Sequence, residues 1–214
     1  MVSRGRFIVF EGLDGAGKTT QIELLMGALR ERNPDLVDLR EPGGTDVGEA
    51  ARRIMFDDPP LPMQPLTWAF LMNAARAELV ASVIKPALDR GVTVIADRYW
   101  YSTLAYQSAG DGLDSETVLT LCQLATGRLE ADLILYLDVP PEVGLERTRL
   151  GTPDVLDRRP LDFHARVRRR YREMAAEDPA HWRVFDGTKQ SDVLAREILG
   201  NVLGVGDVVS ATTR

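Results

Sequence analysis

The sequence contains few of the residues that mark disulfide-rich or zinc-binding proteins. Its 214 residues include one cysteine, Cys122, and two histidines, His164 and His181. A single cysteine excludes a disulfide within the chain, and the histidines are isolated from any set of ligands with zinc-site spacing. These scarcities favour a reducing compartment. We expect Cys122, in an apolar helical stretch, to be a packing residue rather than a nucleophile.

The chain also lacks long hydrophobic runs and an excess of positive charge. No apolar stretch approaches the roughly 18–20 residues that a membrane-spanning helix needs, and the first apolar run ends at Glu11 without a signal-peptide pattern. Lysine and arginine total 26 against 32 acidic residues, which gives a formal net charge of −6. The sequence therefore predicts a cytoplasmic protein with no membrane partner and no nucleic-acid partner, although a local basic site is compatible with this charge.

A phosphate-binding motif is present near the N-terminus. Residues 12–19 match the pattern G-x-x-x-x-G-K-[ST] at every position, between a strand-like run at 7–10 and a helical pattern that starts at residue 21. Glycines allow several backbone N–H groups to face one anion, and the N-terminus of the following helix adds partial positive charge. In this motif Lys18 reaches the β- and γ-phosphates, and the Thr19 hydroxyl is a ligand of Mg²⁺. The chain is therefore expected to bind a nucleoside triphosphate.

Strand and helix patterns alternate along the chain. Strands are predicted at residues 6–11, 36–40, 92–96, 132–138 and 182–185. Helices are predicted at residues 18–31, 45–55, 65–89, 98–109, 114–126, 140–150, 161–178 and 190–203. This alternation, with apolar and β-branched strands, predicts one α/β domain over residues 1–214, in which a five-stranded parallel sheet lies between two helical layers, as in P-loop NTPases. We expect the small, polar tail at 204–214 to be flexible.

Charged residues lie at the ends of four of the predicted strands. These residues are Glu11, Arg40, Asp97 with Arg98, and Asp138. Because parallel strands end at one edge of a sheet, we expect these side chains on the rim that carries the phosphate loop. There, an acid such as Asp97 can orient Mg²⁺ and its water, and an arginine can hold a phosphate through two hydrogen bonds.

These motifs, in this order and spacing, resemble those of bacterial thymidylate kinases over about residues 6–187. The similar segments are Phe10–Thr20, Arg40–Thr45, Ala74–Arg76 with Val83–Leu88, Asp97–Tyr99 with Ser102, Ala105–Gln107 and Leu135–Pro140. The resemblance implies an ATP-dependent dTMP kinase, which transfers the γ-phosphoryl group of ATP to dTMP and gives dTDP for dTTP biosynthesis. It also implies Mg²⁺ bound with ATP, and a homodimer formed through the helix at 65–89.

The resemblance implies roles for individual residues. ATP would contact the loop residues Gly12, Leu13, Asp14, Gly15, Ala16, Gly17, Lys18, Thr19 and Thr20. Mg²⁺ would be bound at Thr19 and Asp97. dTMP would contact Asp14, Arg40, Met72, Arg76, Arg98, Thr103, Tyr106 and Gln107.

For the sugar and phosphate of dTMP, the implied contacts are polar. Asp14 would contact the 3′-hydroxyl, and Tyr106 would crowd the 2′ position and so favour deoxyribose. Arg98 would hold the phosphate, with Arg40 nearby. Guanidinium groups suit this task because their planar fork matches a phosphate.

For the base, the chain departs from the family pattern. Arg76 would hydrogen-bond the thymine, with Thr103 and Gln107 against the same pocket. Met72 occupies the position where the family usually has a phenylalanine that stacks on thymine. Because methionine covers a base face with less rigidity than a ring, strict preference for dTMP over dUMP is not implied. Another pyrimidine nucleoside monophosphate kinase, or a deoxynucleoside kinase, is the alternative.

The catalytic residues implied by the resemblance are Lys18, Arg98, Arg158 and Asp14. The phosphate loop carries no arginine, and in bacterial members of the family a mobile lid supplies that charge. A basic stretch at about 148–161 fits such a lid, because Arg158 follows Asp157 as in the family's lid signature. The lid is shorter than usual, so the sequence leaves open which of its arginines is catalytic.

Two other classes of protein fit the phosphate loop less well. A regulatory GTPase needs an Asn-Lys-x-Asp motif after a late strand, whereas residues 188–191 read Thr-Lys-Gln-Ser and lack the aspartate. A non-catalytic nucleotide-binding module would not need Lys18, Asp97 and Arg98 together with an arginine-bearing lid. An enzyme is therefore favoured over both.

Overall fold

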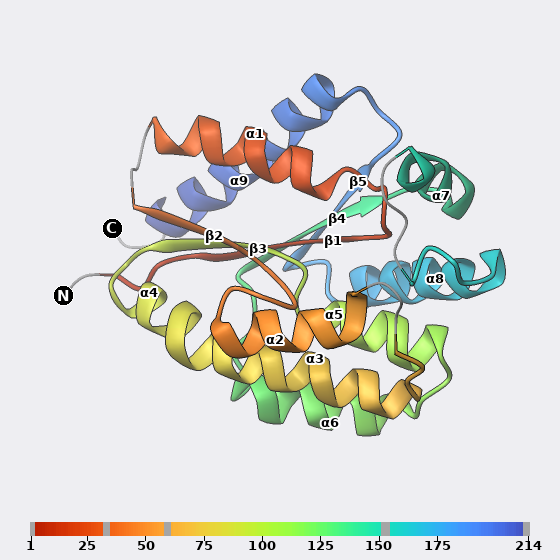
Figure 1. Cartoon of the computed structure of the whole chain (residues 1–214). Helices are drawn as coiled ribbons and strands as arrows, with labels where there is room; N and C mark the ends of the chain where they lie inside the picture. The colour runs from red at the N-terminus through yellow and green to blue at the C-terminus, as the bar shows by residue number, and fades with distance from the viewer. Residues whose placement is uncertain (1–2, 32–34, 58–60, 151–154, 212–214) are drawn as a thin grey trace.

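A parallel sheet of five strands lies between two layers of helices (Figure 1). The computed structural model of the chain describes residues 3–31, 35–57, 61–150 and 155–211, with side chains to residue 204. The strands are β1 (Phe7–Gly12), β2 (Leu36–Arg40), β3 (Thr93–Asp97), β4 (Leu133–Asp138) and β5 (Trp182–Asp186), in the spatial order β2-β3-β1-β4-β5. The predicted strands differ from these bounds by at most one residue, so the predicted fold class is confirmed.

The helices cover both faces of the sheet. They are α1 (Lys18–Arg30), α2 (Asp46–Phe56), α3 (Pro65–Leu79), α4 (Lys85–Asp89), α5 (Trp100–Thr103), α6 (Ser115–Thr126), α7 (Pro141–Arg149), α8 (Leu161–Glu177) and α9 (Ser191–Ala211), with π-helical segments η1 (Val80–Ile84) and η2 (Leu104–Gly110). Figure 1 shows α1 and α9 on one face of the sheet, and α3 to α6 with α8 on the other. In the described ranges, no helix combines the length and apolarity needed to cross a membrane.

The central strands are buried because helices cover them on both sides. All side chains of β1 at 7–10 and of β4 at 133–137 are buried. Near-continuous apolar strands are what a parallel sheet with two covered faces requires. A second, smaller apolar cluster lies outside this core and is formed by Met55, Trp68 and Met72 from α2 and α3.

The strand register brings the ends of β1, β2 and β3 to one edge of the sheet. Phe10 pairs with Asp97, and Asp97 also pairs with Arg40. The connections from β1 and β3 leave in opposite directions, which makes this pair of strands the topological switch point of the sheet. In open α/β sheets, ligands bind outside the carboxyl ends of the strands at this point. The phosphate loop, Glu41 and Arg98 follow the ends of β1, β2 and β3, and they therefore lie close together at this edge of the sheet.

Two helices that the sequence predicts as continuous contain π-helical turns. The helix predicted at 65–89 is α3, η1 and α4 in succession, and the helix predicted at 98–109 starts at Trp100 and continues as η2. A π-turn accommodates one extra residue, which hydrophobic periodicity does not reveal. Tyr106 and Gln107 lie on η2, and π-turns are common at functional sites.

The last helix is longer than predicted, and the lid is described in part. Helix α9 ends at Ala211 rather than at residue 203. Of the lid predicted at 148–161, residues 151–154 lie outside the described residues, and residues 155–159 form turns that lead into α8. Residues 212–214 of the predicted tail also lie outside the described residues. The mobility of lid and tail stays a prediction.

Candidate active site

The phosphate loop joins β1 to α1 in a conformation that glycine adopts readily. Gly15 and Gly17 have φ values of 73° and 94°, in the region that side chains disfavour. A Cβ atom on Gly15 would lie 2.2 Å from the carbonyl oxygen of Gly144 in α7. Glycine is therefore required at residue 15 both by backbone geometry and by the close approach of α7.

Lys18, the first residue of α1, lies across this loop. Its Nζ donates hydrogen bonds to the carbonyl oxygens of Gly12, at 3.2 Å, and Leu13, at 3.0 Å. Burial lowers the pKa of Lys18, and repulsion from Arg98 acts in the same direction, whereas nearby carboxylates oppose the shift. The ammonium group is thus held inside the loop, where phosphate oxygens can replace its carbonyl partners.

Thr19 and Asp97 are close enough to bind one metal ion. The Thr19 hydroxyl donates to Asp97 Oδ2 at 3.4 Å, and Asp97 Oδ1 is buried with no hydrogen-bond partner among the described residues. Hydroxyl and carboxylate oxygens are ligands that Mg²⁺ prefers, and a cation would satisfy the unpaired oxygen. The described residues contain no group of three or more His, Cys, Asp or Glu side chains that could hold a metal ion by themselves. The donors therefore fit an Mg²⁺ ion that arrives with a phosphate.

Arg98 follows β3 in an unusual backbone conformation. Its φ of 74° is a left-handed value that is uncommon for a residue with a β-carbon. The Arg98 N–H donates to the Phe10 carbonyl at 2.9 Å, and the Tyr99 N–H donates to Glu11 Oε1 at 2.9 Å. These two hydrogen bonds to β1 stabilise the turn and place Arg98 beside the phosphate loop.

The Arg98 guanidinium is at the centre of the polar site. Its Nη2 lies 2.5 Å from Asp14 Oδ1, and its Nη1 donates to the Gly12 carbonyl and to Ser102 Oγ, each at 3.0 Å. The Tyr106 hydroxyl donates to the other Asp14 oxygen at 3.0 Å. Burial acts to raise the pKa of Asp14, but attraction to nearby cations, Arg98 first, outweighs it and lowers this pKa to about 2. Asp14 is therefore an ionised hydrogen-bond acceptor at neutral pH.

Glu11, at the end of β1, supports this arginine from inside the protein. It is fully buried and accepts hydrogen bonds from the hydroxyls of Ser102, at 2.7 Å, and Tyr171, at 2.8 Å. Burial raises the pKa of Glu11, and the charge of Arg98 opposes this shift most strongly. Tyr171 comes from α8 and reaches the site only through the fold, so no local pattern predicts it.

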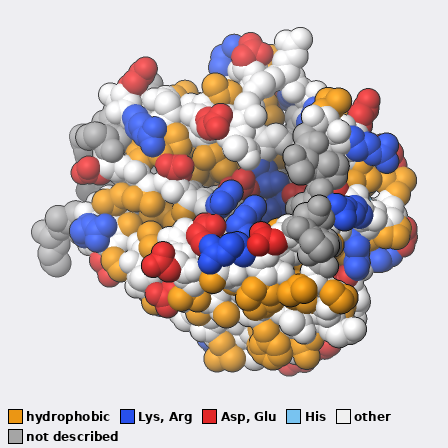
Figure 2. Space-filling view, viewed as in Figure 1, with side chains coloured by type: hydrophobic (Ala, Val, Ile, Leu, Met, Phe, Trp, Pro, Cys, Tyr) orange, Lys and Arg blue, Asp and Glu red, His pale blue; other side chains and the backbone are white. Residues whose placement is uncertain are grey.

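Two cavities meet at the polar side chains around Arg98. Figure 2 shows basic side chains around a hollow at the centre of the face in view. The first, which we name the loop cavity, has a volume of about 480 Å³ and is lined by the phosphate loop with Arg40, Arg52, Asp97, Arg98 and Arg147. The second, which we name the aromatic cavity, has a volume of about 90 Å³. Its polar side is formed by Asp14, Glu41, Arg52, Arg98, Ser102, Tyr106 and Gln107, and its apolar side by Pro42, Phe56, Trp68, Met72 and Leu156. The residues that line both cavities are Asp14, Glu41, Arg52 and Arg98.

Most of the predicted site residues lie at these two cavities. The loop cavity contains Gly15, Gly17, Lys18, Thr19, Thr20, Arg40 and Asp97 from the predicted set. The aromatic cavity contains Met72, Tyr106 and Gln107. Arg40 is exposed at the rim and pairs with Glu49 at 3.6 Å. The predicted residues that line neither cavity, as the structure describes them, are Gly12, Leu13, Ala16, Arg76, Thr103 and Arg158.

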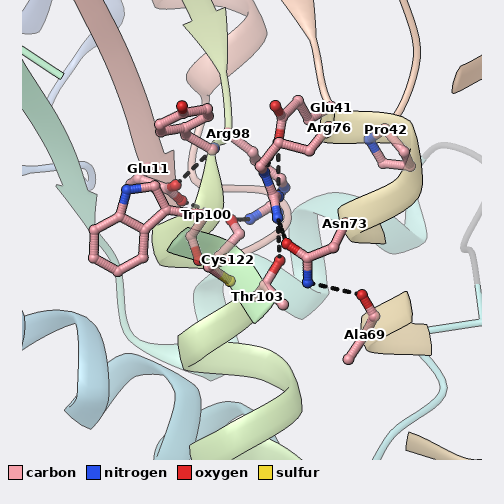
Figure 3. A network of polar contacts seen from close by, with 12 residues as sticks. Glu11, Glu41, Pro42, Ala69, Asn73, Arg76, Arg98, Trp100, Thr103 and Cys122 are labelled. Carbon is pink, nitrogen blue, oxygen red and sulfur yellow. Dashed lines mark hydrogen bonds and ion pairs between the residues drawn. The ribbon is translucent and has the colours of Figure 1, made fainter. Parts of the chain in front are cut away.

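Arg76 is fully buried and is held by a set of polar contacts (Figure 3). Its Nε donates to Glu41 Oε2 at 2.7 Å, and its Nη1 donates to Asn73 Oδ1 and Thr103 Oγ1, each at 3.0 Å. Nη2 forms an ion pair with the same Glu41 oxygen at 2.7 Å and has no further hydrogen-bond partner in the part of the chain that the structure describes. Burial raises the pKa of Glu41 to about 7, against the attraction of Arg76. Because Glu41 lines both cavities, this network adjoins the site directly.

Two arginines without a predicted role also line the loop cavity. Arg52, on α2, donates to the Pro42 carbonyl at 3.1 Å. Arg147, on α7, donates to the carbonyl oxygens of Gly15, at 3.2 Å, and Gly187, at 3.0 Å. Arg147 directly precedes the basic stretch predicted as the lid, and that stretch of arginines could have indicated it. No local signal distinguishes Arg52 from a surface arginine of an amphipathic helix.

Arg158, predicted to be catalytic, lies away from the loop cavity. It is exposed and lines a separate groove with Glu142, Leu145 and Arg149. A direct contact with transferred phosphate would require the lid to move toward the phosphate loop. The catalytic role of Arg158 therefore stays a prediction.

The fold and these two cavities define a P-loop phosphotransferase, because a phosphate loop after β1 faces a second cavity through shared charged side chains. Comparison with known proteins gives the family. The family model described as thymidylate kinase matches residues 10–198. The thymidylate kinase of Thermomicrobium roseum is 48% identical, with 93% of this chain and 95% of the relative covered. The thymidylate kinase of Deinococcus radiodurans is 42% identical, with 92% and 96% covered.

A solved structure agrees with these relatives. The crystal structure of thymidylate kinase from Ehrlichia chaffeensis aligns with a TM-score of 0.76 at 29% identity, and the alignment covers 93% of this chain and 99% of that one. The chain belongs to the thymidylate kinase family, and it is an ATP-dependent dTMP kinase. The family, the fold and the enzyme class expected from the sequence are thereby confirmed.

Proposed function

We propose that the loop cavity binds the phosphates of ATP and the aromatic cavity binds dTMP, so that the γ-phosphoryl group passes between them. The observation that carries this arrangement is that Asp14 and Arg98 line both cavities. A phosphate held by Arg98 from one cavity then faces a triphosphate held by Lys18 in the other. Phosphoryl transfer depends on this positioning of two anions and on nearby positive charge more than on a base.

The sugar and phosphate of dTMP contact the polar side of the aromatic cavity. Asp14 accepts a hydrogen bond from the 3′-hydroxyl, and the Tyr106 ring restricts the 2′ position to deoxyribose. The hydrogen bond from Tyr106 to Asp14, at 3.0 Å, supports these two roles because it holds the Tyr106 ring beside the carboxylate that would contact the sugar. Arg98 binds the phosphate, and Arg40 assists from the rim.

The base is recognised by Arg76, Thr103 and Gln107, with Met72 packed against it. Gln107 and Met72 line the aromatic cavity. For Arg76, the support is its position beside the aromatic cavity: its guanidinium pairs with Glu41, with Nη2 2.7 Å from Glu41 Oε2, and Glu41 lines that cavity.

The charges of the reaction are balanced by cations around the loop cavity. Mg²⁺, bound at Thr19 and Asp97 with ATP, would neutralise charge on the phosphate oxygens. Lys18 contacts the donor phosphates, and Arg158 adds positive charge when the lid closes. This arrangement needs no general base, so no side chain with a pKa near neutrality has to accept a proton for phosphoryl transfer to occur.

An ADP-release assay with Mg-ATP and several acceptors tests the proposal. The acceptors are dTMP, dUMP, UMP, CMP, dCMP, AMP, GMP and thymidine. We expect the highest kcat/KM with dTMP, lower values with ribonucleotides because of Tyr106, and no turnover of thymidine, which lacks the phosphate that Arg98 holds. Preference for another monophosphate would overturn the assignment of the base residues, and turnover of thymidine would overturn the role of Arg98.

We also propose that the chain forms a homodimer through α3 and α6 in the cytoplasm. Leu66 and Phe70 on α3 and Leu124 on α6 are exposed, Leu124 by 76%. Figure 2 shows hydrophobic side chains gathered over these helices at the lower edge of the molecule. Contiguous exposed apolar surface is typical of a protein interface. Size-exclusion chromatography with light scattering should give a mass twice the chain mass of 23.7 kDa. A monomeric mass at micromolar concentration would contradict the dimer.

A further inference from the structure

We propose that Trp68 determines specificity for the acceptor base: its indole, supported by Phe56, forms the apolar wall against which the pyrimidine packs. The proposal rests on the assignment of the aromatic cavity to dTMP. It makes Met72 a secondary contact and gives a role to a tryptophan that the sequence patterns do not single out.

The two sides of the aromatic cavity suit the two parts of a nucleotide. The polar side carries the charged and hydroxyl groups that can hold a phosphate and a sugar. The apolar side is therefore left for the uncharged ring of the base, as is usual in ligand sites that combine apolar walls with a few polar groups. On that side, Trp68 and Phe56 are the aromatic residues among those that line the cavity.

Trp68 and Phe56 are held as a pair by contacts from two helices. Their ring centroids are 5.3 Å apart and their planes meet at 83°, an edge-to-face arrangement. The guanidinium of Arg52 lies over Phe56, with Cζ 5.2 Å from the ring centroid. Contacts of this kind favour one ring orientation. A ring held in place loses less conformational freedom when a base binds than the flexible side chain of Met72 does.

Trp68 is not a residue of the main core. It belongs with Met55 and Met72 to the separate small cluster, and 9% of its surface is exposed. Its indole also lines a third cavity, of about 270 Å³, with residues from 61–65 and 155–159. A ring between two cavities lacks protein contacts over part of its surface, whereas a ring that only fills a core is surrounded by other side chains.

The lid segment completes the same wall. Leu156 lines both the aromatic cavity and the third cavity, and Val155 packs on the cluster that contains Trp68. Trp68 is therefore in contact with the region where the lid meets the acceptor site, and a base packed on the indole would also adjoin Leu156.

Steady-state kinetics of three variants test the proposal. Trp68→Leu removes the aromatic wall, Trp68→Phe keeps a ring, and Trp100→Leu is the matched control, because Trp100 lines none of the three cavities as the structure describes them. We expect Trp68→Leu to raise KM for dTMP about tenfold. Its kcat and its KM for ATP should stay within about twofold of the unmodified chain, because the base contact is equal in ground state and transition state. Trp68→Phe should return KM for dTMP to within about threefold, and Trp100→Leu should leave it unchanged.

Tryptophan fluorescence gives a readout that does not depend on turnover. dTMP added without ATP should quench the emission of the unmodified chain and of Trp100→Leu, but not that of Trp68→Phe. Quenching that survives in Trp68→Phe, or an unchanged KM for dTMP in Trp68→Leu, would overturn the proposal. If Trp68→Leu instead lowered kcat, raised the KM values for dTMP and ATP by the same factor and lowered the melting temperature, the role of Trp68 would be purely structural. That result would also overturn the proposal. Failure of the proposed function would be seen separately, because the unmodified chain would then show no preference for dTMP.

Discussion

The loop cavity and the aromatic cavity share Asp14, Glu41, Arg52 and Arg98, yet the chain builds them in opposite ways. The loop cavity depends on the consecutive backbone of residues 12–19 and on the N-terminus of α1. The aromatic cavity depends on side chains from α2, α3, η2 and the lid segment, which are far apart in the sequence. A phosphate has the same shape and charge in every nucleotide, so a short local motif can bind it, whereas a particular base requires residues that only the fold brings together.

Arg98 belongs to both cavities, so its removal should have the largest effect. Arg98→Ala should lower kcat/KM for dTMP about a thousandfold, because both the acceptor phosphate and the transferred group lose a cation. Calorimetric titration with ATP should show affinity within about threefold of the unmodified chain, since the loop itself is intact. Arg98→Lys should recover only part of the loss because an ammonium cannot bind a phosphate through two hydrogen bonds. Activity of Arg98→Ala within a few-fold of normal would contradict the assignment.

Substitution of Arg158 tests whether the cations that line the loop cavity are sufficient for phosphoryl transfer or whether an arginine of the lid is also needed. Arg158→Ala should lower kcat about a hundredfold and leave both KM values unchanged, because its charge would act on the transferred group only. The control is Arg169→Ala on α8, whose exposed side chain pairs with Glu173 at 3.9 Å. Equal activity of the two variants would mean that Arg158 is not catalytic and that cations already at the loop cavity, such as Arg147, are sufficient.

Tyr106 tests the acceptor half alone. Tyr106→Phe removes the hydrogen bond to Asp14, which accepts as a carboxylate, and should raise KM for dTMP about tenfold. The ring remains, so the preference for deoxyribose over ribose acceptors should persist. Tyr106→Ala should lose that preference, measured as the ratio of kcat/KM for dUMP and UMP. A change in KM for ATP in either variant would show that the two cavities are not separable at this residue.

Substitution of Glu41 should produce the smallest effect. This effect depends on pH and concerns the free energy of unfolding rather than turnover. Burial, opposed by Arg76 and reinforced by Glu11, raises the pKa of Glu41 from 4.5 to about 7. Between these values the folded chain binds more protons than the unfolded chain, so this group's contribution to the free energy of unfolding decreases as pH rises from about 5 to about 8. Chemical denaturation at several pH values should show this decrease, and Glu41→Gln should reduce it. Parallel curves for the two proteins would mean that Glu41 is ionised throughout the range.

The same contrast explains how much the sequence predicts. The strands, the fold class and the phosphate loop follow from local patterns, namely buried apolar runs and a contiguous glycine-rich motif. The left-handed turn at Arg98 does not, because it depends on hydrogen bonds to the Phe10 carbonyl and to Glu11 on a neighbouring strand. The position of Trp68 beside Phe56 depends on the packing of α3 against α2, which hydrophobic periodicity does not specify. Resemblance to a family names base-contacting residues by position, and the positions it names do not include Trp68, the wall that we propose for the base.

In evolutionary terms, the π-helical segment η2 limits where the chain can gain or lose a residue. Successive residues of an α-helix are about 100° apart around the helix axis. Deletion of one residue between Leu104 and Tyr106 would replace the π-helical turn by regular α-helix and would shift Tyr106 and Gln107 to other positions around the helix axis relative to Asp14. The same deletion in η1 would shift residues of η1, none of which lines either cavity as described. Descendants of this sequence should therefore tolerate changes in length at η1 more readily than at η2.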